Sequence, residues 1–304
     1  MFPTASPRDL ALLLLLSAIW GGSYTLIKLA LPTVPPVTIT AGRMVVAAAL
    51  MLIVLGLRGE RLPARLRNWA PFVVTGLIGN ALPFTLINWG ETRIDAGLAA
   101  ILTGVMPLGT VLLAHIFTAD ERFTAWKGAG LAAGFAGLVV LVGGDALEGL
   151  GGPVLAQLAV IGAAMCYATS TVYARCLRGV PPTVTATATL VTASVAMVPA
   201  SVVVDAPWTL RPDAIAVAAI VLLGLGATAG GMLIFFVLVN SAGATVTALV
   251  NYLVPLMGVM WGWLVLAETP SWQALVALAL IFLGIAAINR PPRGVRTGRP
   301  SARA

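Results

Sequence analysis

Apolar runs of about 20 residues recur along this chain, and short breaks rich in Pro, Gly and charged residues separate them. One such run, folded as a helix, crosses the ~30 Å hydrocarbon core of a bilayer. The ten-residue alternating strands of an outer-membrane barrel do not occur in the sequence. The pattern predicts an all-α polytopic membrane protein with ten transmembrane helices, at about residues 9–31, 36–57, 69–90, 95–117, 124–142, 153–178, 183–204, 213–239, 243–266 and 271–289.

The ten predicted helices form two matching sets of five. At an offset of 147–148 residues, unusual positions of the two halves coincide, for example Pro107 with Pro255. Because each set has an odd number of crossings, the second copy lies upside down in the bilayer, as in many secondary transporters. We expect a first five-helix repeat at 9–142, a Gly-rich loop at 143–152, a second inverted repeat at 153–289, and a basic cytoplasmic tail at 290–304.

Composition and the placement of charged residues predict how the chain is oriented in the membrane. The chain is 59% hydrophobic and 10% charged, which leaves too few polar residues for a soluble domain. With the N-terminus in the cytoplasm, fourteen of the eighteen Lys and Arg lie inside and two lie outside. This positive-inside bias predicts that both termini are cytoplasmic in a multi-pass protein of the cytoplasmic (inner) membrane. The bilayer surface accounts for the net charge of +7, so no nucleic-acid partner is expected.

Small residues recur at the spacing that lets two helices approach closely. The clearest examples are Gly130 with Gly134 and Gly226 with Gly230. Both pairs are predicted to lie at helix–helix contacts.

Polar and aromatic residues gather at mid-helix positions on corresponding helices of both halves. In repeat-built carriers the substrate site lies near the bilayer midplane between the repeats. An aromatic ring there can stack on a solute, while a hydroxyl or amide hydrogen-bonds it. For any single Ser, Thr or Asn, a bond between helices explains the residue equally well. The predicted substrate-binding residues are Trp20, Tyr24, Asn80, Phe84, Thr103, Met106, Tyr167, Thr171, Thr228, Asn251 and Tyr252.

Charged residues inside membrane spans are costly and point to function by default. Arg43 lies well inside the second predicted helix, and Glu91 and Asp95 lie near the outer ends of the third and fourth. Such groups form either a structural ion pair or an outer gate whose pairing alternates. A proline inside a span acts either as a hinge or as a static kink. The predicted gating residues are Lys28, Arg43, Glu91, Asp95, Pro107 and Pro255.

The order and spacing of several short elements carry a family resemblance. In the first half these are Ile19-Trp-Gly-Gly-Ser23 with Lys28, Arg43, and Ala96…Ala100…Pro107; in the second half they are Ala244…Ala248…Pro255 and Leu266-Ala-Glu268. Over about residues 9–289 the chain resembles the EamA type of the drug/metabolite transporter superfamily. The resemblance implies a carrier that works without ATP, often an exporter of amino acids or other metabolites, with aromatic amino acid exporters as the nearest relatives. The resemblance does not identify the substrate, because members of the family share scaffold motifs more than pocket residues.

The sequence therefore predicts a secondary transporter that exports amino acids or similar small metabolites by alternating access. The alternatives are an intramembrane enzyme and a channel-like facilitator for small polar solutes. The sequence has no His-Glu-x-x-His, Gly-x-Ser-x-Gly or P-loop motif, so no catalytic residue, metal or cofactor is expected. Its predicted partners are a small-molecule substrate and the lipid bilayer. The substrate, the coupling ion and the oligomeric state are left open, and a monomer is compatible with the sequence.

Overall fold

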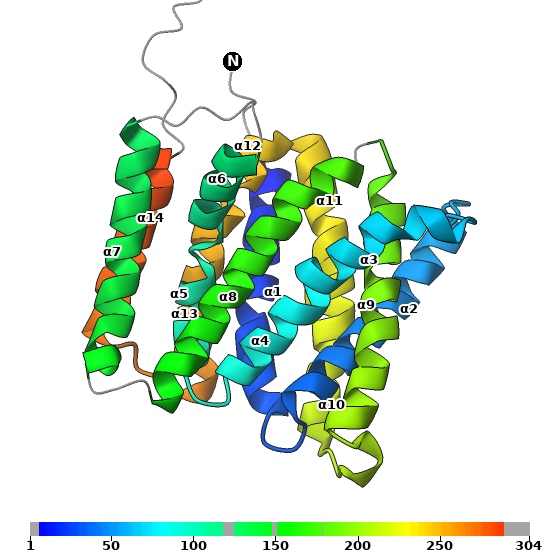
Figure 1. Cartoon of the computed structure of the whole chain (residues 1–304), viewed down its shortest axis with the longest axis horizontal. Coiled ribbons are helices and arrows are strands. Elements are labelled where there is room, and N and C mark those ends of the chain that lie inside the picture. The colour runs from blue at the N-terminus through cyan, green and yellow to red at the C-terminus, as the bar shows by residue number, and fades with distance from the viewer. Residues whose placement is uncertain (1–5, 118–124, 148–150, 178, 289–304) are drawn as a thin grey trace, which may run out of the picture.

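The computed structural model describes residues 6–117, 125–147, 151–177 and 179–288. Within these ranges the chain is helical, has no strand, and runs up and down ten times as a single bundle (Figure 1). Eight of its helical segments are at least 18 residues long and apolar enough to cross a membrane. Two more, Val250–Leu266 and Trp272–Ile288, are shorter apolar helices. The predicted fold class, an all-α polytopic membrane protein, is confirmed.

Several crossings consist of more than one helical segment. In the first half the elements are α1 Pro7–Ala30, α2 Pro36–Leu57, η1 Leu66–Trp69, α3 Ala70–Gly76, η2 Leu77–Ala81, α4 Leu82–Gly90, α5 Ala96–Thr103, α6 Met106–Phe117 and α7 Ala125–Leu147. In the second half they are α8 Gly152–Tyr173, η3 Ala174–Leu177, α9 Pro182–Val204, η4 Pro207–Thr209, α10 Ala214–Leu222, η5 Leu223–Gly230, α11 Gly231–Ser241, α12 Gly243–Thr247, α13 Val250–Leu266 and α14 Trp272–Ile288.

Local sequence sets where the helices begin. Ser6 and Asp9 form a capping box at the start of α1: the Asp9 N–H donates to Ser6 Oγ at 3.2 Å, and the Ser6 N–H donates to Asp9 Oδ2 at 3.1 Å. Proline opens α2 at Pro36 and α9 at Pro182, where a missing N–H costs nothing because the first turn has no acceptor for it. These signals place most helix ends within a few residues of the predicted ones.

The fifth helix is longer than predicted. The sequence suggested a loop from residue 143, but α7 continues through Gly143-Gly-Asp145 to Leu147. A glycine costs only about 1 kcal/mol in a helix relative to alanine. That cost is too small to end a helix that packs along α14.

The two predicted glycine pairs have different surroundings. Gly130 lies against Gly284 of α14, and a Cβ added to Gly130 would come within 2.5 Å of the Gly284 carbonyl oxygen. Gly226 has no atom within 4 Å of its added Cβ, and Gly230 would meet only its own helix. The prediction is therefore confirmed for Gly130 and wrong for the Gly226/Gly230 pair, which lies in η5 instead of at a helix contact.

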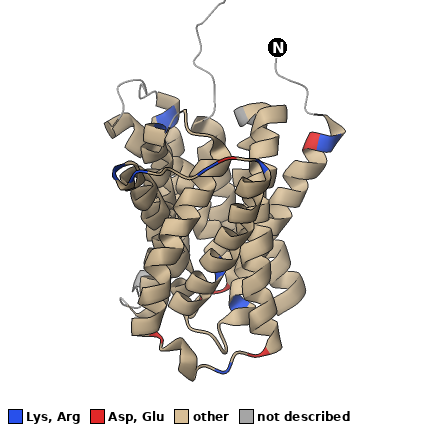
Figure 2. Cartoon of the chain, turned by 90° about the vertical axis from the view of Figure 1, so that its right-hand side faces the viewer, with Lys and Arg blue, Asp and Glu red and all other residues tan. Residues whose placement is uncertain are grey.

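The remaining crossings surround the middle of the bundle. α7 and α14 pack on each other at the left edge of Figure 1, while α1 packs on α13 and α2 on α9, which joins the two halves. Charged residues gather at the two ends of the helices, and a few lie inside the bundle towards its lower end in Figure 2. The interior charges belong to the candidate site.

Candidate functional site

Arg43 is the central charged residue of the bundle interior. Its side chain is only 4% exposed. The Nε–H donates to Thr228 Oγ1 at 2.7 Å, and the guanidinium carbon lies 3.8 Å from the centre of the Phe84 ring. Both partners are neutral. Within the described ranges, no carboxylate forms an ion pair with Arg43.

The predicted pairing of Arg43 or Lys28 with Glu91 or Asp95 is therefore wrong for this conformation. Glu91 is fully buried, yet neither of its carboxylate oxygens has a hydrogen-bond partner. Asp95 is exposed at the start of α5, and Lys28 is half-buried near the end of α1. The prediction considered only opposite charges, whereas the fold gives Arg43 a hydroxyl and an aromatic face.

Other predicted residues from both halves converge on Arg43. Tyr167 of α8 packs edge-on against Phe84 of α4, with ring centres 6.0 Å apart. The Tyr24 hydroxyl of α1 hydrogen-bonds Thr103 Oγ1 of α5, and Tyr24 and Tyr167 both lie within electrostatic range of Arg43. Six helical segments thus bring aromatic rings, hydroxyls and one cation together. We name Tyr24, Arg43, Phe84, Thr103, Tyr167 and Thr228 the Arg43 cluster.

Two π-helical segments lie at equivalent positions in the two halves. They are η2 at Leu77–Ala81 and η5 at Leu223–Gly230, and an offset of 148 residues superposes them. In η5, Thr228 Oγ1 donates to Leu223 O, five residues back, at 2.9 Å. Wider π turns often occur at functional sites, because they leave backbone groups available for other bonds. Here one of them positions the hydroxyl that Arg43 binds.

Trp20 uses such a backbone group. Its indole N–H donates to Ala227 O of η5 at 2.9 Å, and its ring stacks on Phe235 of α11 with centres 5.9 Å apart. Gly231 makes room, since a Cβ there would collide with the indole nitrogen. One edge and one face of Trp20 are therefore held by the protein, and its contact with a substrate stays a prediction.

The other predicted site residues make local or peripheral contacts. Asn80 is buried within η2, and Met106 packs against the main hydrophobic core. Thr171 is exposed and donates to Tyr167 O of its own helix, and the Asn251 amide donates to Ala248 O. Tyr252 packs against Phe282 of α14, with ring centres 5.7 Å apart. The structure does not bring these five residues into the Arg43 cluster.

The fourth and ninth crossings are both interrupted, but at different places. In the fourth, α5 ends at Thr103 and α6 starts at Met106, so that Pro107 lies in the first turn of α6. In the ninth, the break falls between α12 and α13, and Pro255 lies inside the continuous α13. The two prolines therefore differ in setting, although the alignment makes them equivalent, and their role as hinges stays a prediction.

Glu268 caps a helix at one end of the bundle, a contact that the sequence did not reveal. It lies between α13 and α14, yet it caps α5: the Ala96 and Gly97 N–H groups donate to its two oxygens at 2.9 and 3.0 Å. A carboxylate at a helix N-terminus satisfies free N–H groups and interacts favourably with the helix dipole. The signal for this cap is long-range and cannot be read from local sequence.

Glu268→Ala is expected to destabilise the protein by about 1–2 kcal/mol, the usual cost of a lost N-cap together with its charge. Thermal unfolding of the purified protein in detergent measures the loss. Asp95→Ala is the matched control, since Asp95 precedes the same helix but its side chain makes no capping hydrogen bond. Equal melting temperatures for the two variants would show that the Glu268 cap adds nothing to stability.

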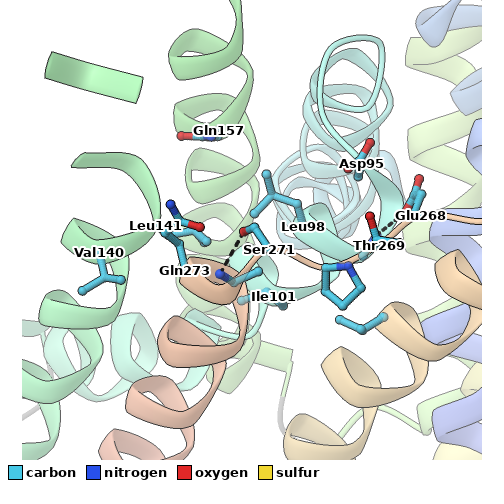
Figure 3. A pocket seen from close by; sticks show the side chains of 14 residues that line it. Asp95, Leu98, Ile101, Val140, Leu141, Gln157, Glu268, Thr269, Ser271 and Gln273 are labelled. Atoms are coloured by element: carbon cyan, nitrogen blue, oxygen red, sulfur yellow. Dashed lines mark hydrogen bonds between the residues drawn. The ribbon is translucent and has the colours of Figure 1, made fainter. Parts of the chain in front are cut away.

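A pocket of about 270 Å³ lies beside this cap. Its apolar walls come from α5, α7, α13 and α14, and its polar part is formed by Asp95, Gln157, Glu268, Thr269, Ser271 and Gln273 (Figure 3). Pockets that enclose organic ligands usually measure ~300–1,000 Å³. The pocket is therefore small, and it shares no lining residue with the Arg43 cluster.

A model of the EamA-like transporter family matches residues 9–143 and 154–290. The chain belongs to this family. Its members are transporters, so the protein is a multi-pass membrane transporter that moves a small-molecule substrate.

Relatives cover almost the whole transporter. The uncharacterized transporter YoaV of Bacillus subtilis is 21% identical over 88% of this chain and 91% of its own. The uncharacterized inner membrane transporter YedA of Escherichia coli K12 is 26% identical over 89% of this chain and 87% of its own. A probable terminal-alkyne amino-acid exporter of Streptantibioticus cattleyicolor is 29% identical over 91% of this chain and 92% of its own.

A solved crystal structure has the same fold as the transporter. It superposes with a TM-score of 0.65 at 21% identity and covers 93% of this chain and 97% of the other. At that identity the likeness concerns the fold alone.

Proposed function

We propose that the transporter exports amino acids or similar small metabolites by alternating access, and that Arg43 binds the carboxylate of the solute. The observation that carries this proposal is the surroundings of Arg43, which is buried and, among the described residues, has a hydroxyl and an aromatic ring as its side-chain partners and no carboxylate. A charge inside a membrane protein is costly unless it is paired or meets water in a cavity. A substrate carboxylate would supply the missing anion.

The rest of the Arg43 cluster suits the same class of solute. A guanidinium can hold a carboxylate through two parallel hydrogen bonds, and four of its five N–H donors remain beyond the bond to Thr228. Phe84 and Tyr167 offer aromatic surface, and Tyr24 and Thr103 offer hydroxyls. One of the relatives carries the name of an amino-acid exporter, which agrees with this chemistry.

The transport cycle is proposed to use two inverted repeats, at 9–142 and 153–289. The equivalent π-helical segments η2 and η5 support this division, and so do the opposite directions in which α1 and α8 run (Figure 1). The different breaks in the fourth and ninth crossings suit two repeats in different conformations. We further propose that both termini and the basic tail 290–304 lie in the cytoplasm, from the distribution of Lys and Arg.

The test is uptake of a panel of radiolabelled amino acids into proteoliposomes, with and without a pH gradient. At least one amino acid should enter at a rate that saturates with concentration and should exchange with unlabelled solute inside. Vesicles without protein give the background. Rates at that background for every amino acid would reject this substrate class, and rates that never saturate would point to a channel-like facilitator.

A further inference from the structure

Glu91 is a buried acid that neither the fold nor the proposed carboxylate site uses. It follows the last residue of α4, its side chain has 0% exposure, and neither carboxylate oxygen has a hydrogen-bond partner. Other acids of the bundle have donors: Glu268 caps α5, Asp205 accepts from the Thr38 N–H at 2.8 Å, and Asp213 caps α10. Glu91 therefore needs a different explanation from a helix cap.

An ionised carboxylate in this place would be expensive. Removing it from water costs several kcal/mol, which only close partners can offset. A protonated carboxyl group is neutral and avoids most of that cost. In the conformation described, the burial of Glu91 thus favours a bound proton.

A second unsatisfied acceptor lies on the same face of α4. The Asn88 side-chain NH₂ donates to Pro36 O at 3.1 Å and to Thr40 Oγ1 at 2.9 Å, which fixes the orientation of the amide. Its oxygen, Asn88 Oδ1, is then buried without a donor. Residues three apart on a helix are neighbours, so Asn88 and Glu91 offer three acceptor oxygens and no hydrogen. A proton on Glu91 supplies one.

The charges around Glu91 come from three places. They are Lys28 on α1, Arg43 on α2 and Glu268 between α13 and α14, together with the Tyr24 hydroxyl. None of them is in hydrogen-bond contact with the carboxylate. α5 and α8, which also pack here, contain no charged residue within their bounds. An ionised Glu91 would be attracted most by Lys28, repelled by Glu268, and attracted more weakly by Arg43.

We propose that Glu91 takes up and releases one proton in each transport cycle and thereby couples solute movement to protons. An ionised Glu91 competes with the solute carboxylate for the positive field of Arg43, so the solute binds to the form in which Glu91 is protonated. Release of the Glu268 cap and opening of the outer end would bring Glu91 to water, where it can exchange its proton. Solute and proton then cross in the same direction, so that export runs down the solute gradient and carries one proton out with each solute. This inference rests on the proposed function for the identity of the solute.

The test compares two measurements in proteoliposomes that contain wild type, Glu91→Gln or Asp213→Asn. Exchange of labelled for unlabelled amino acid at equal pH reports carrier function. Accumulation driven by an acidic exterior reports coupling, and for one proton per solute it can reach about tenfold per pH unit. Asp213→Asn is the matched acid-to-amide control, because Asp213 is exposed and asparagine also caps helices.

Wild type and Asp213→Asn should both exchange and accumulate solute. Glu91→Gln, which resembles the protonated form, should keep exchange and lose accumulation. No exchange in wild type would reject the proposed function itself. Three outcomes would overturn the proton site but not the carrier function. They are exchange without pH-driven accumulation in wild type, pH-driven accumulation that persists in Glu91→Gln, and accumulation that follows a sodium gradient.

A measurement on wild type alone covers the case in which Glu91→Gln fails to fold. Addition of solute to the purified protein in weakly buffered detergent solution at mildly alkaline pH should take up protons, because solute binding and protonation are linked. The solute should also bind more weakly as the pH rises. Binding without proton uptake, at an affinity that does not change with pH, would overturn the inference.

Discussion

Arg43→Met is expected to abolish transport while the protein remains folded. Replacing a buried charge that has no ionic partner by an apolar side chain of similar length is often neutral or stabilising. Truncating one partner of a buried charge pair costs about 2–5 kcal/mol of binding. If Arg43 holds the solute carboxylate, solute affinity should fall by at least about 30-fold. Equilibrium exchange in proteoliposomes and thermal unfolding in detergent give the two readouts.

Two further variants sharpen this test. Arg67→Met removes an exposed arginine at the end of the bundle and should change neither transport nor melting. Arg43→Lys keeps the charge but loses the planar guanidinium over Phe84 and should transport poorly. If Arg43→Met lowers the melting temperature and the remaining folded protein transports normally, Arg43 is a structural residue.

Gly21→Leu is expected to prevent assembly of the bundle. α1 and α13 cross at Gly21, where an added Cβ would lie 2.5 Å from Met257 Cβ and 2.7 Å from the Gly258 backbone nitrogen. Backbone atoms cannot move aside as a flexible side chain can, so the two helices must separate. Even one extra methylene in a tight contact costs about 1–3 kcal/mol, and leucine adds four carbons. Size-exclusion chromatography of a fluorescent fusion should show loss of the monodisperse peak.

Gly56→Leu is the matched control for this change. Gly56 lies near the end of α2, is exposed, and has no atom within 4 Å of an added Cβ. Its variant should elute and melt like wild type. Equal behaviour of the Gly21 and Gly56 variants would show that α1 and α13 do not cross as described.

The sequence predicted the ten crossings well because membrane spans have strong local signals. Apolar length, proline at helix starts and charged residues in the loops are all visible along the chain, and α2 runs from Pro36 to Leu57 as predicted. The prediction failed at α7, because glycine alone is a weak stop signal and the contact with α14 outweighs it.

The interior of the site was harder to predict because its contacts are long-range. The sequence singled out Arg43 as a charge within a span, in a structural ion pair or a gate, but its partner Thr228 is 185 residues away and neutral, so a search for opposite charges missed it. The π-helical segments have no apolar periodicity of their own; the glycines and alanines around Thr228 are the only local hint of η5. The burial of Glu91 was missed because the turn after α4 was taken to be at the membrane surface.

Recognition of a carboxylate by Arg43 is the central claim, and competition during exchange tests it most directly. Exchange of the best labelled amino acid is measured in the presence of the same compound unlabelled, its methyl ester, or the amine that lacks the carboxylate. If Arg43 holds the carboxylate, the ester and the amine should compete at least about 30-fold more weakly than the acid, given the ~2–5 kcal/mol of such a pair. Equal competition by the acid, the ester and the amine would contradict the claim.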